Sequence, residues 1–120
     1  MSEESKAVAR AYYDAINSRD PDAVLATYTD DARTWVLGDG PYSGFHSISR
    51  EFVAGFLEAS ELRFTILSMI SEGDKVALEV ESQGTFDGKP YANRYHNLVT
   101  VREGKVAEFK EYFDTARALG

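Results

Sequence analysis

The chain has 120 residues, and 20 acidic side chains against 13 lysines and arginines give a formal net charge of −7. This length predicts one domain over residues 1–120, and 43% hydrophobic with 28% charged residues is typical of a globular protein. The acidic balance argues against nucleic acid or an anionic membrane as a partner, because both attract basic surfaces. With no cysteine in the chain, disulfides, thiolate catalysis and cysteine-bound metals are excluded.

The sequence carries no signal for export or for membrane insertion. Its first residues, Met1–Lys6, are polar and acidic, unlike a secretory leader. The longest nearly apolar run, residues 64–70, is far too short to span a bilayer. We therefore expect a cytoplasmic protein.

The first half of the chain is predicted to be mainly helical. Apolar side chains at helical spacing predict a helix over 3–18, and Asp20-Pro21 is typical of an N-cap followed by proline at the first helical position. A short second helix is expected over 21–28, a strand over 32–37, and a third helix over 47–59.

The second half is predicted to be β. Alternating apolar and polar residues predict strands over 62–71, 75–86, 90–102 and 105–115, separated by Gly73, Asp87-Gly88 and Gly104. The element order helix–helix–strand–helix–four strands predicts an α+β fold, a cone-like curved mixed β-sheet wrapped around helices with an apolar pocket.

Three polar residues interrupt the apolar face of these strands. In the last strand, Ala107, Phe109, Glu111 and Phe113 share one face. In the strand before it, Tyr91, Asn93, Tyr95, Asn97, Val99 and Val101 share the corresponding face. Asn93, Asn97 and Glu111 are therefore expected to point toward the helices.

Turn chemistry predicts which of these residues meet. A two-residue turn at Asp87-Gly88 places Leu78 opposite Asn97 and Val80 opposite Tyr95. For the last hairpin, a two-residue turn would mismatch the faces, so we predict a three-residue loop that pairs Val101 with Lys105. Tyr95 is then expected to face Glu111, and Asn97 to face Phe109.

Glu111 is the carboxylate that this pattern singles out. Surrounded by aromatic side chains it would lose hydration, which favours the neutral form and moves its pKa toward neutrality. Two interpretations stay open: a pocket acid or base with Asn97 and tyrosine hydroxyls as hydrogen-bonding partners, or a structural carboxyl capped by neighbouring donors. The two histidines lie on different predicted elements and make no recognisable metal site.

The sequence resembles the nuclear-transport-factor-2-like superfamily, which includes SnoaL-like polyketide cyclases, ketosteroid isomerases and limonene-epoxide hydrolases. The segments that carry the resemblance are Ala11–Asn17, Asp20–Ala23, Thr29–Ala32, Tyr42–Gly44, Gly104–Val106 and Glu111–Asp114. The resemblance implies a conical α+β fold with a deep apolar pocket, commonly dimeric.

Only some of the functional positions of the ketosteroid isomerases are matched by suitable residues in this chain. Tyr12 matches the tyrosine donor of the ketosteroid isomerase oxyanion hole, a site that serves as a standard worked case, and Asn97 stands where the second donor, an aspartic acid, is found. The isomerase base falls on Val36, which makes steroid isomerisation by that mechanism implausible.

Two other groups of the superfamily share an acid at Glu111. The other polar catalytic residues of the epoxide hydrolases are missing from this chain, which has Thr34, Val36, Leu78 and Val80 at those positions. The cyclases place a histidine where this chain has Asn97.

We therefore expect a SnoaL-like enzyme that needs no metal or organic cofactor and acts on a small hydrophobic molecule by isomerase, cyclase, dehydratase or hydrolase chemistry. The alternative is a non-catalytic ligand-binding or scaffold module of the same fold. A homodimer through the outer sheet face is expected. The catalytic residues would be Glu111, Tyr12, Asn97 and Tyr95, and the substrate pocket would comprise Thr34, Val36, Phe56, Leu78, Val80, Asn93, Val99, Phe109 and Phe113.

Overall fold

A computed structural model of the protein describes residues 2–119, with side chains through residue 117. Its helices are α1 (Ser2–Ser18), α2 (Pro21–Ala26), α3 (Arg50–Ala59) and α4 (Thr115–Leu119). Its strands are β1 (Tyr28–Val36), β2 (Gly44–Ser47), β3 (Ser60–Glu72), β4 (Lys75–Phe86), β5 (Lys89–Arg102) and β6 (Lys105–Glu111). The fold is α+β, as the sequence predicts.

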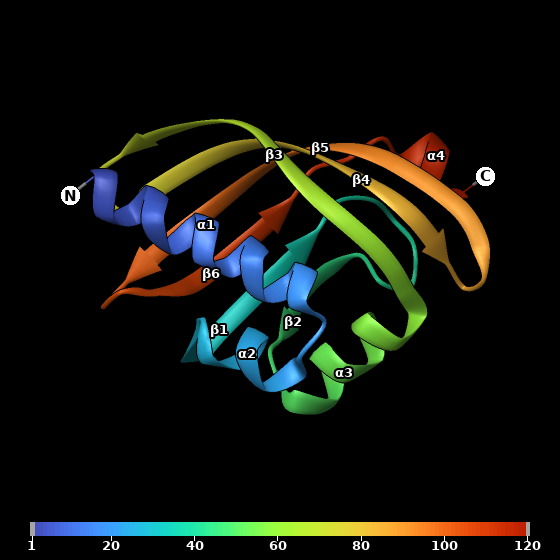
Figure 1. The fold of residues 1–120 in the computed structure, drawn as a ribbon, viewed down its shortest axis with the longest axis horizontal. Helices are drawn as coiled ribbons and strands as arrows, with labels where there is room; N and C mark the ends of the chain where they lie inside the picture. Colours follow the sequence, from blue (N-terminus) through green and yellow to red (C-terminus); the bar gives the residue numbers. More distant parts are fainter. Residues whose placement is uncertain (1, 120) are drawn as a thin grey trace.

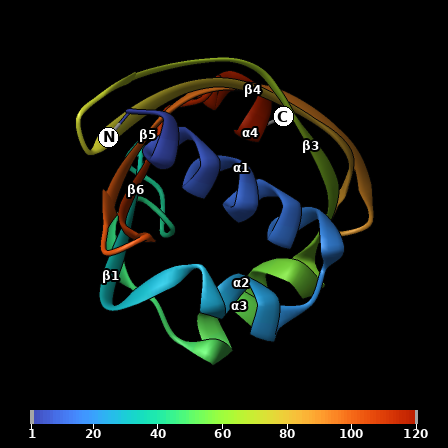
Figure 2. The same cartoon turned by 60° about the vertical axis from the view of Figure 1, so that its left-hand side comes forward.

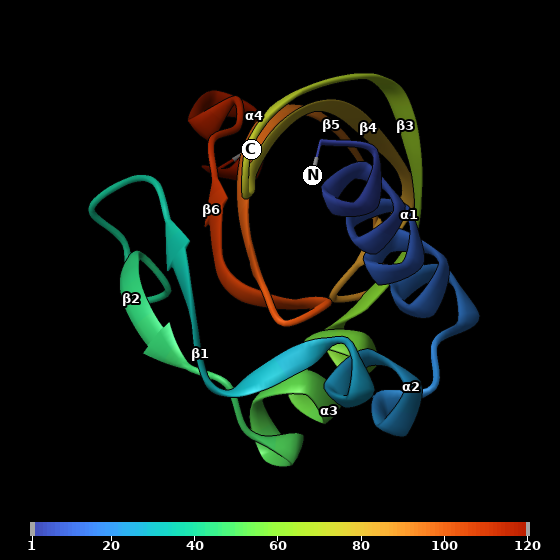
Figure 3. The ribbon, with the colours of Figure 1, turned by 90° about the vertical axis from the view of Figure 1, so that its left-hand side faces the viewer.

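The six strands form one strongly curved, unclosed sheet in the order β2-β1-β6-β5-β4-β3. All neighbouring strands are antiparallel except β1 and β6, which run parallel, so the sheet is mixed. Figure 1 shows the long strands β3, β4 and β5 arching over α1, and Figure 3 shows the sheet curling around this helix. The strands β2 and β3 form the two edges.

The core lies between α1 and the concave face of the sheet. The buried residues of α1 are Ser5, Ala9, Tyr12, Tyr13 and Ile16, which recur at the spacing of one helix face. They pack against inward side chains of the strands, among them Val76, Leu78, Val80, Val99 and Phe109. In Figure 2, α2 and α3 lie side by side below α1.

Two helix boundaries differ from prediction because local hydrogen bonds compete with the helix. The second helix ends at Ala26 rather than Tyr28, since the Thr27 hydroxyl and amide both bond back to Val24 and Tyr28 starts β1 opposite Val106. The third begins at Arg50 rather than Ser47, because the Ser49 hydroxyl caps it by accepting from the amide of Phe52 at 3.1 Å.

Two short elements are absent from the prediction. Residues 44–47 form β2, which pairs with 33–36 of β1. The predicted last strand, 105–115, ends at Glu111, and an isolated bridge joins Phe113 to Tyr95 before the chain turns into α4. The Asp114 carboxylate accepts from the amide of Ala116 at 3.1 Å, which starts that helix.

The first predicted register is confirmed, and the second is wrong by one residue at the turn and by two residues beyond it. Asp87 and Gly88 both have positive φ, and Leu78 lies opposite Asn97, as a type I′ turn requires. The last hairpin also has a two-residue turn, Glu103-Gly104, so Arg102 pairs with Lys105 and Val101 with Val106.

A β-bulge restores the faces that this turn would mismatch. Between Val101↔Val106 and Thr100↔Glu108 the register shifts, leaving Ala107 as the extra residue on β6. Beyond the bulge Val99, rather than Asn97, lies opposite Phe109, and continuing this register places Asn97 across from Glu111. Because the error is an even number of residues, Phe109 keeps its predicted inward face, whereas Val106 replaces Ala107 as the buried residue near the turn.

Within residues 2–119, no helix has the length and apolar character needed to cross a membrane.

Candidate active site

Glu111 lies at the end of β6, where three strands meet. It pairs with Val36 of the parallel strand β1, and its backbone carbonyl accepts from the amide of Leu37 at 3.1 Å. On its other side is β5, with Asn97 across from it. The side chain is half-buried, and its position on the strand directs it toward the concave side with Phe109.

Four tyrosines from three elements gather around this carboxyl. Tyr12 and Tyr13 come from α1, Tyr28 from the start of β1, and Tyr95 from β5, and all are buried. The ring centroid of Tyr12 lies 5.4 Å from that of Tyr28 and 5.1 Å from that of Phe109. Burial raises the pKa of all four phenols, and the nearby charge of Glu111 raises the pKa of each further.

Three of the four phenols share a hydrogen bond with another hydroxyl group. The hydroxyls of Tyr12 and Tyr28 lie 2.8 Å apart, and the hydroxyl of Tyr95 lies 2.8 Å from that of Ser82. In each pair one hydroxyl donates to the other, which leaves one O–H free to donate elsewhere. With their raised pKa values the phenols stay protonated at neutral pH, so these hydrogens remain available.

Asn97 connects α1 to the last strand. Its amide nitrogen donates to the hydroxyl of Tyr13 at 2.8 Å, and its amide oxygen accepts from the backbone amide of Tyr112 at 3.1 Å. Tyr13 therefore accepts a hydrogen bond from Asn97 and keeps its own O–H as a donor. The predicted oxyanion donor Asn97 thus donates a hydrogen bond to the phenol of Tyr13.

Glu111 differs from these groups because its carboxyl makes no hydrogen bond to any residue that the structure describes. Burial alone raises its pKa from 4.5 to about 7. A carboxyl with this pKa exists in both protonation states near neutral pH, so it can give or accept a proton there. Beside it, phenolic O–H groups can donate to a developing oxyanion.

The remaining predicted pocket residues divide into core and rim. Leu78, Val80 and Val99 are fully buried, and the buried Thr34 donates its hydroxyl to the carbonyl of Phe109 at 3.2 Å. Val36 and Phe113 are partly exposed, and Phe56 is 36% exposed.

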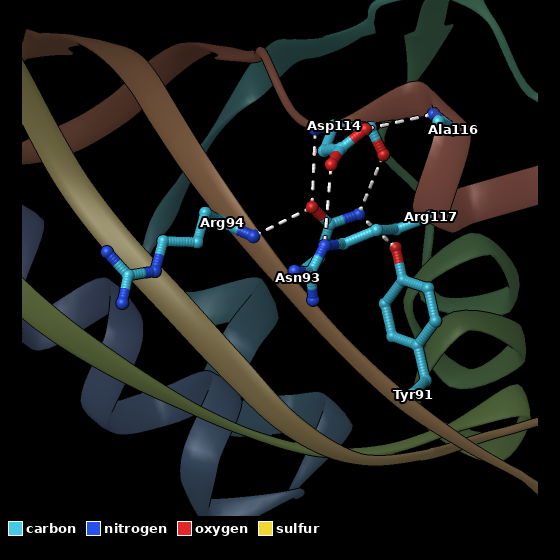
Figure 4. A network of polar contacts seen from close by, with 6 residues as sticks. All are labelled: Tyr91, Asn93, Arg94, Asp114, Ala116 and Arg117. Atoms are coloured by element: carbon cyan, nitrogen blue, oxygen red, sulfur yellow. Dashed lines mark hydrogen bonds and ion pairs between the residues drawn. The ribbon is translucent and has the colours of Figure 1, made fainter.

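Asn93 is saturated by bonds within the protein (Figure 4). Its amide nitrogen donates to the Tyr91 hydroxyl at 2.6 Å and to the carbonyl of Asp114 at 3.1 Å. Its amide oxygen accepts from the backbone amides of Arg94 at 2.7 Å and Asp114 at 3.2 Å. Arg117 pairs with the Asp114 carboxylate at 3.4 Å. Asn93 therefore links β5 to the backbone of Asp114, just before α4.

Two hollows stand out on the surface, and both lie away from Glu111. One, of about 540 Å³, lies between α1 and β3, and the other, of about 510 Å³, lies at the β3–β4 hairpin. An apolar pocket at Glu111 therefore stays a prediction. Over residues 2–119 there is no group of three or more acidic or histidine side chains that could hold a metal ion.

Tyr13 and Tyr28 are the site residues that sequence reasoning missed. Tyr13 continues the buried series Ser5, Ala9 and Ile16 of α1 at intervals of three or four residues. That spacing was a readable signal. Tyr28 offered no such signal, because its contact with Tyr12 depends on the helix ending before it.

Comparison with known proteins agrees with this fold. The family model of the SnoaL-like domain matches residues 9–109. No curated protein matches the sequence.

Solved structures of similar fold cover nearly the whole chain. Bal32a from a soil-derived mobile gene cassette is 18% identical, with 98% of this chain and 95% of that chain covered and a TM-score of 0.84. An NTF2-like protein of unknown function from Burkholderia pseudomallei is 24% identical, with 99% and 96% covered and a TM-score of 0.81. TerC, co-crystallised with polyporic acid, is 20% identical, with 94% and 93% covered and a TM-score of 0.79.

Proposed function

The chain belongs to the SnoaL-like domain family, within the nuclear-transport-factor-2-like superfamily, and we propose on this basis that it is an enzyme of small hydrophobic molecules. It would work by acid–base chemistry, without a cofactor, in an isomerase, cyclase, dehydratase or hydrolase reaction. The carrying observation is Glu111, a carboxyl with a pKa of about 7 and no hydrogen-bonding partner in the described residues. That TerC was co-crystallised with polyporic acid supports binding of an organic molecule by this fold.

In the proposed mechanism Glu111 takes a proton from, or gives one to, a substrate carbon or oxygen. The charge that develops on a substrate oxygen would be stabilised by the free phenolic hydrogens of the surrounding tyrosines. Tyr13, which accepts a hydrogen bond from Asn97, and one hydroxyl of the Tyr12–Tyr28 pair each keep an O–H that can donate in this way. The apolar surroundings strengthen each of these interactions by excluding water.

The test removes the acid and keeps the shape. The protein is incubated with a panel of steroid ketones, terpenoid epoxides and polyketide-like ketones, and products are identified by mass spectrometry. For any compound that turns over, Glu111→Gln should lower kcat by about 100-fold or more. The matched control Glu61→Gln, an exposed position on β3, should leave kcat unchanged. Full activity of Glu111→Gln would show that Glu111 is not the acid or base.

A non-catalytic binding or scaffold module is the second candidate, and the aromatic packing favours it. Tyr12, Tyr13, Phe64 and Phe109 have ring centroids 5.1–6.3 Å apart, so side chains fill much of the space beneath α1. Saturable binding of a panel compound, detected by NMR without any product, would favour this candidate. A homodimer through the outer sheet face also stays a prediction. On that face the ring centroids of Trp35 and Tyr112 lie 5.1 Å apart.

A further inference from the structure

A hollow lies at the rim of the sheet's concave face, between α1 and the edge strand β3. α1 and the edge strand β3 are tied together at both ends. At one end the side-chain amide of Asn17 bonds the backbone of Phe64, and at the other the hydroxyl of Ser5 donates to the carbonyl of Gly73. Between these ties the helix and the strand enclose the hollow of about 540 Å³, a volume typical of small-molecule sites.

The floor of this hollow is apolar. Tyr13 and Phe64 are buried beneath it, while Ile66 and Met69 pack against the core and keep part of their surface exposed. The register of β3 shifts between Ile66 and Ser68, so the strand bulges along this stretch. A bulged edge strand is a poor template for another strand, which favours a small ligand over an added peptide strand.

Cations line the rim. Lys6 and Arg10 lie four residues apart on α1, and Arg63 lies on β3 beside Phe64, the residue that Asn17 bonds. Lys6 pairs with Glu3 at 3.4 Å, whereas neither arginine takes part in an ion pair found within residues 2–119. Asp14 is the acidic residue among the lining side chains. The hollow is therefore locally positive on a chain whose net charge is −7.

We propose that this groove binds an amphipathic carboxylate, a single-chain or aryl acid small enough to enter it. Its carboxylate would pair with the guanidinium of Arg10 or with that of Arg63, since a guanidinium pairs with a carboxylate through two parallel hydrogen bonds. Its apolar part would cover Ile66 and Met69. Glu111 does not line the groove, and Tyr13 is the residue that the two sites share, so binding here does not depend on the proposed catalysis.

The experiment titrates uniformly ¹⁵N-labelled protein with octanoate and follows amide shifts. Shifts should concentrate on 6–17 and 63–69. The exposed double variant Arg10→Gln/Arg63→Gln should weaken binding at least tenfold, and Asp14→Asn should tighten it, because an anion would no longer repel the ligand. The neutral analogue octan-1-ol should bind at least tenfold more weakly than octanoate.

Controls separate charge at the groove from charge elsewhere. Lys89→Gln, an exposed change at the first residue of β5, should keep the wild-type affinity, and so should Glu111→Gln. Equal affinity of the double arginine variant, equal affinity for octan-1-ol, or shifts centred elsewhere would overturn the proposal. Binding to vesicles of anionic lipid without binding of free octanoate would also overturn it.

Discussion

Two inward-facing polar residues, Asn93 and Glu111, differ in how many hydrogen bonds their side chains make within the protein. Asn93 makes four hydrogen bonds within the protein, whereas the Glu111 carboxyl makes none among the described residues. A saturated amide stabilises the fold and has nothing left for a ligand. An unpaired carboxyl costs free energy when it ionises. Retaining a half-buried carboxyl without a partner among the described residues is what we expect of a group that acts on a molecule from outside the chain.

The pH dependence of stability follows from the pKa of Glu111. Between pH 4.5 and about 7 the unfolded chain ionises this carboxyl while the folded protein keeps it protonated. The folded state then binds more protons, so the free energy of unfolding should fall as pH rises through this window, by up to about 3 kcal/mol. Urea unfolding at pH 4.5, 6 and 8 should show that fall in the wild-type protein, and Glu111→Gln should lack it. Parallel curves for Glu111→Gln and wild type would contradict the raised pKa.

The inward position of Glu111 could be predicted from the sequence, while its neighbours Tyr13 and Tyr28 were not predicted. Alternation along 105–113 is a local pattern, and it places Glu111 with Phe109 whatever the rest of the chain does. The neighbours of Glu111 depend on a bulge and on where α2 ends. Tyr28 enters the site because Thr27 ends the helix by bonding back to Val24.

At the scale of elements, two hairpins with the same turn differ in how well the turn residues suit it. Both turns have positive φ at both positions. Asp87-Gly88 is a favoured pair for a type I′ turn, whereas Glu103-Gly104 places a long side chain in the left-handed region at φ 53°. The three-residue loop was predicted because a two-residue turn would mismatch the strand faces, and it is wrong because the chain corrects that mismatch later, at Ala107.

The strained turn predicts a stabilising substitution. Glu103→Asn should raise the free energy of unfolding by about 0.5–1 kcal/mol, because asparagine tolerates the left-handed conformation better. Thermal and urea unfolding measure the change. Asp87→Asn is the matched control, since aspartate already suits its turn, and it should change stability less. If Glu103→Asn is neutral or destabilising, strain at Glu103 is not significant.

Short elements escaped prediction at this scale because tertiary pairing creates them. β2 has only four residues, Gly44–Ser47, and exists through its pairing with β1. α4 has five residues and begins at a segment fastened by Asn93. The longer strands β4 and β5 carry enough alternation for sequence to predict bounds within a residue of those observed.

At the scale of the whole molecule, α1 is held against the sheet by polar ties between residues distant in sequence. Asn17 uses its side-chain amide to complete the free edge of β3: its nitrogen donates to the Phe64 carbonyl at 2.9 Å, and its oxygen accepts from the Phe64 amide at 2.8 Å. The hydrogen bond from Asn97 to Tyr13 also joins α1 to the sheet, at the central strand β5. These ties fix the helix relative to both candidate sites.

Removing one tie should therefore weaken the whole fold. Asn17→Ala leaves the amide and carbonyl of Phe64 without partners and should lower the free energy of unfolding by about 2–3 kcal/mol. Urea denaturation gives the loss, and hydrogen exchange at the Phe64 amide should accelerate. The neighbouring Ser18→Ala removes only two exposed bonds, to the carbonyl of Ala15 and from the amide of Asp20, and should cost much less. Equal losses for the two variants would refute the structural role of Asn17.

The parallel pairing of β1 with β6 also has a consequence for how the protein is made. Arg33 pairs with Glu108, which is 75 residues later in the chain. At about 5–20 residues per second, the ribosome takes roughly 4–15 s to supply the partner strand after β1 has been synthesised. Until then the β1–β2 hairpin has an unpaired edge that can pair with other exposed strands. Slower elongation over 37–105 would prolong that exposure, so codon choice in this stretch becomes a determinant of yield for a fold whose final stability it does not alter.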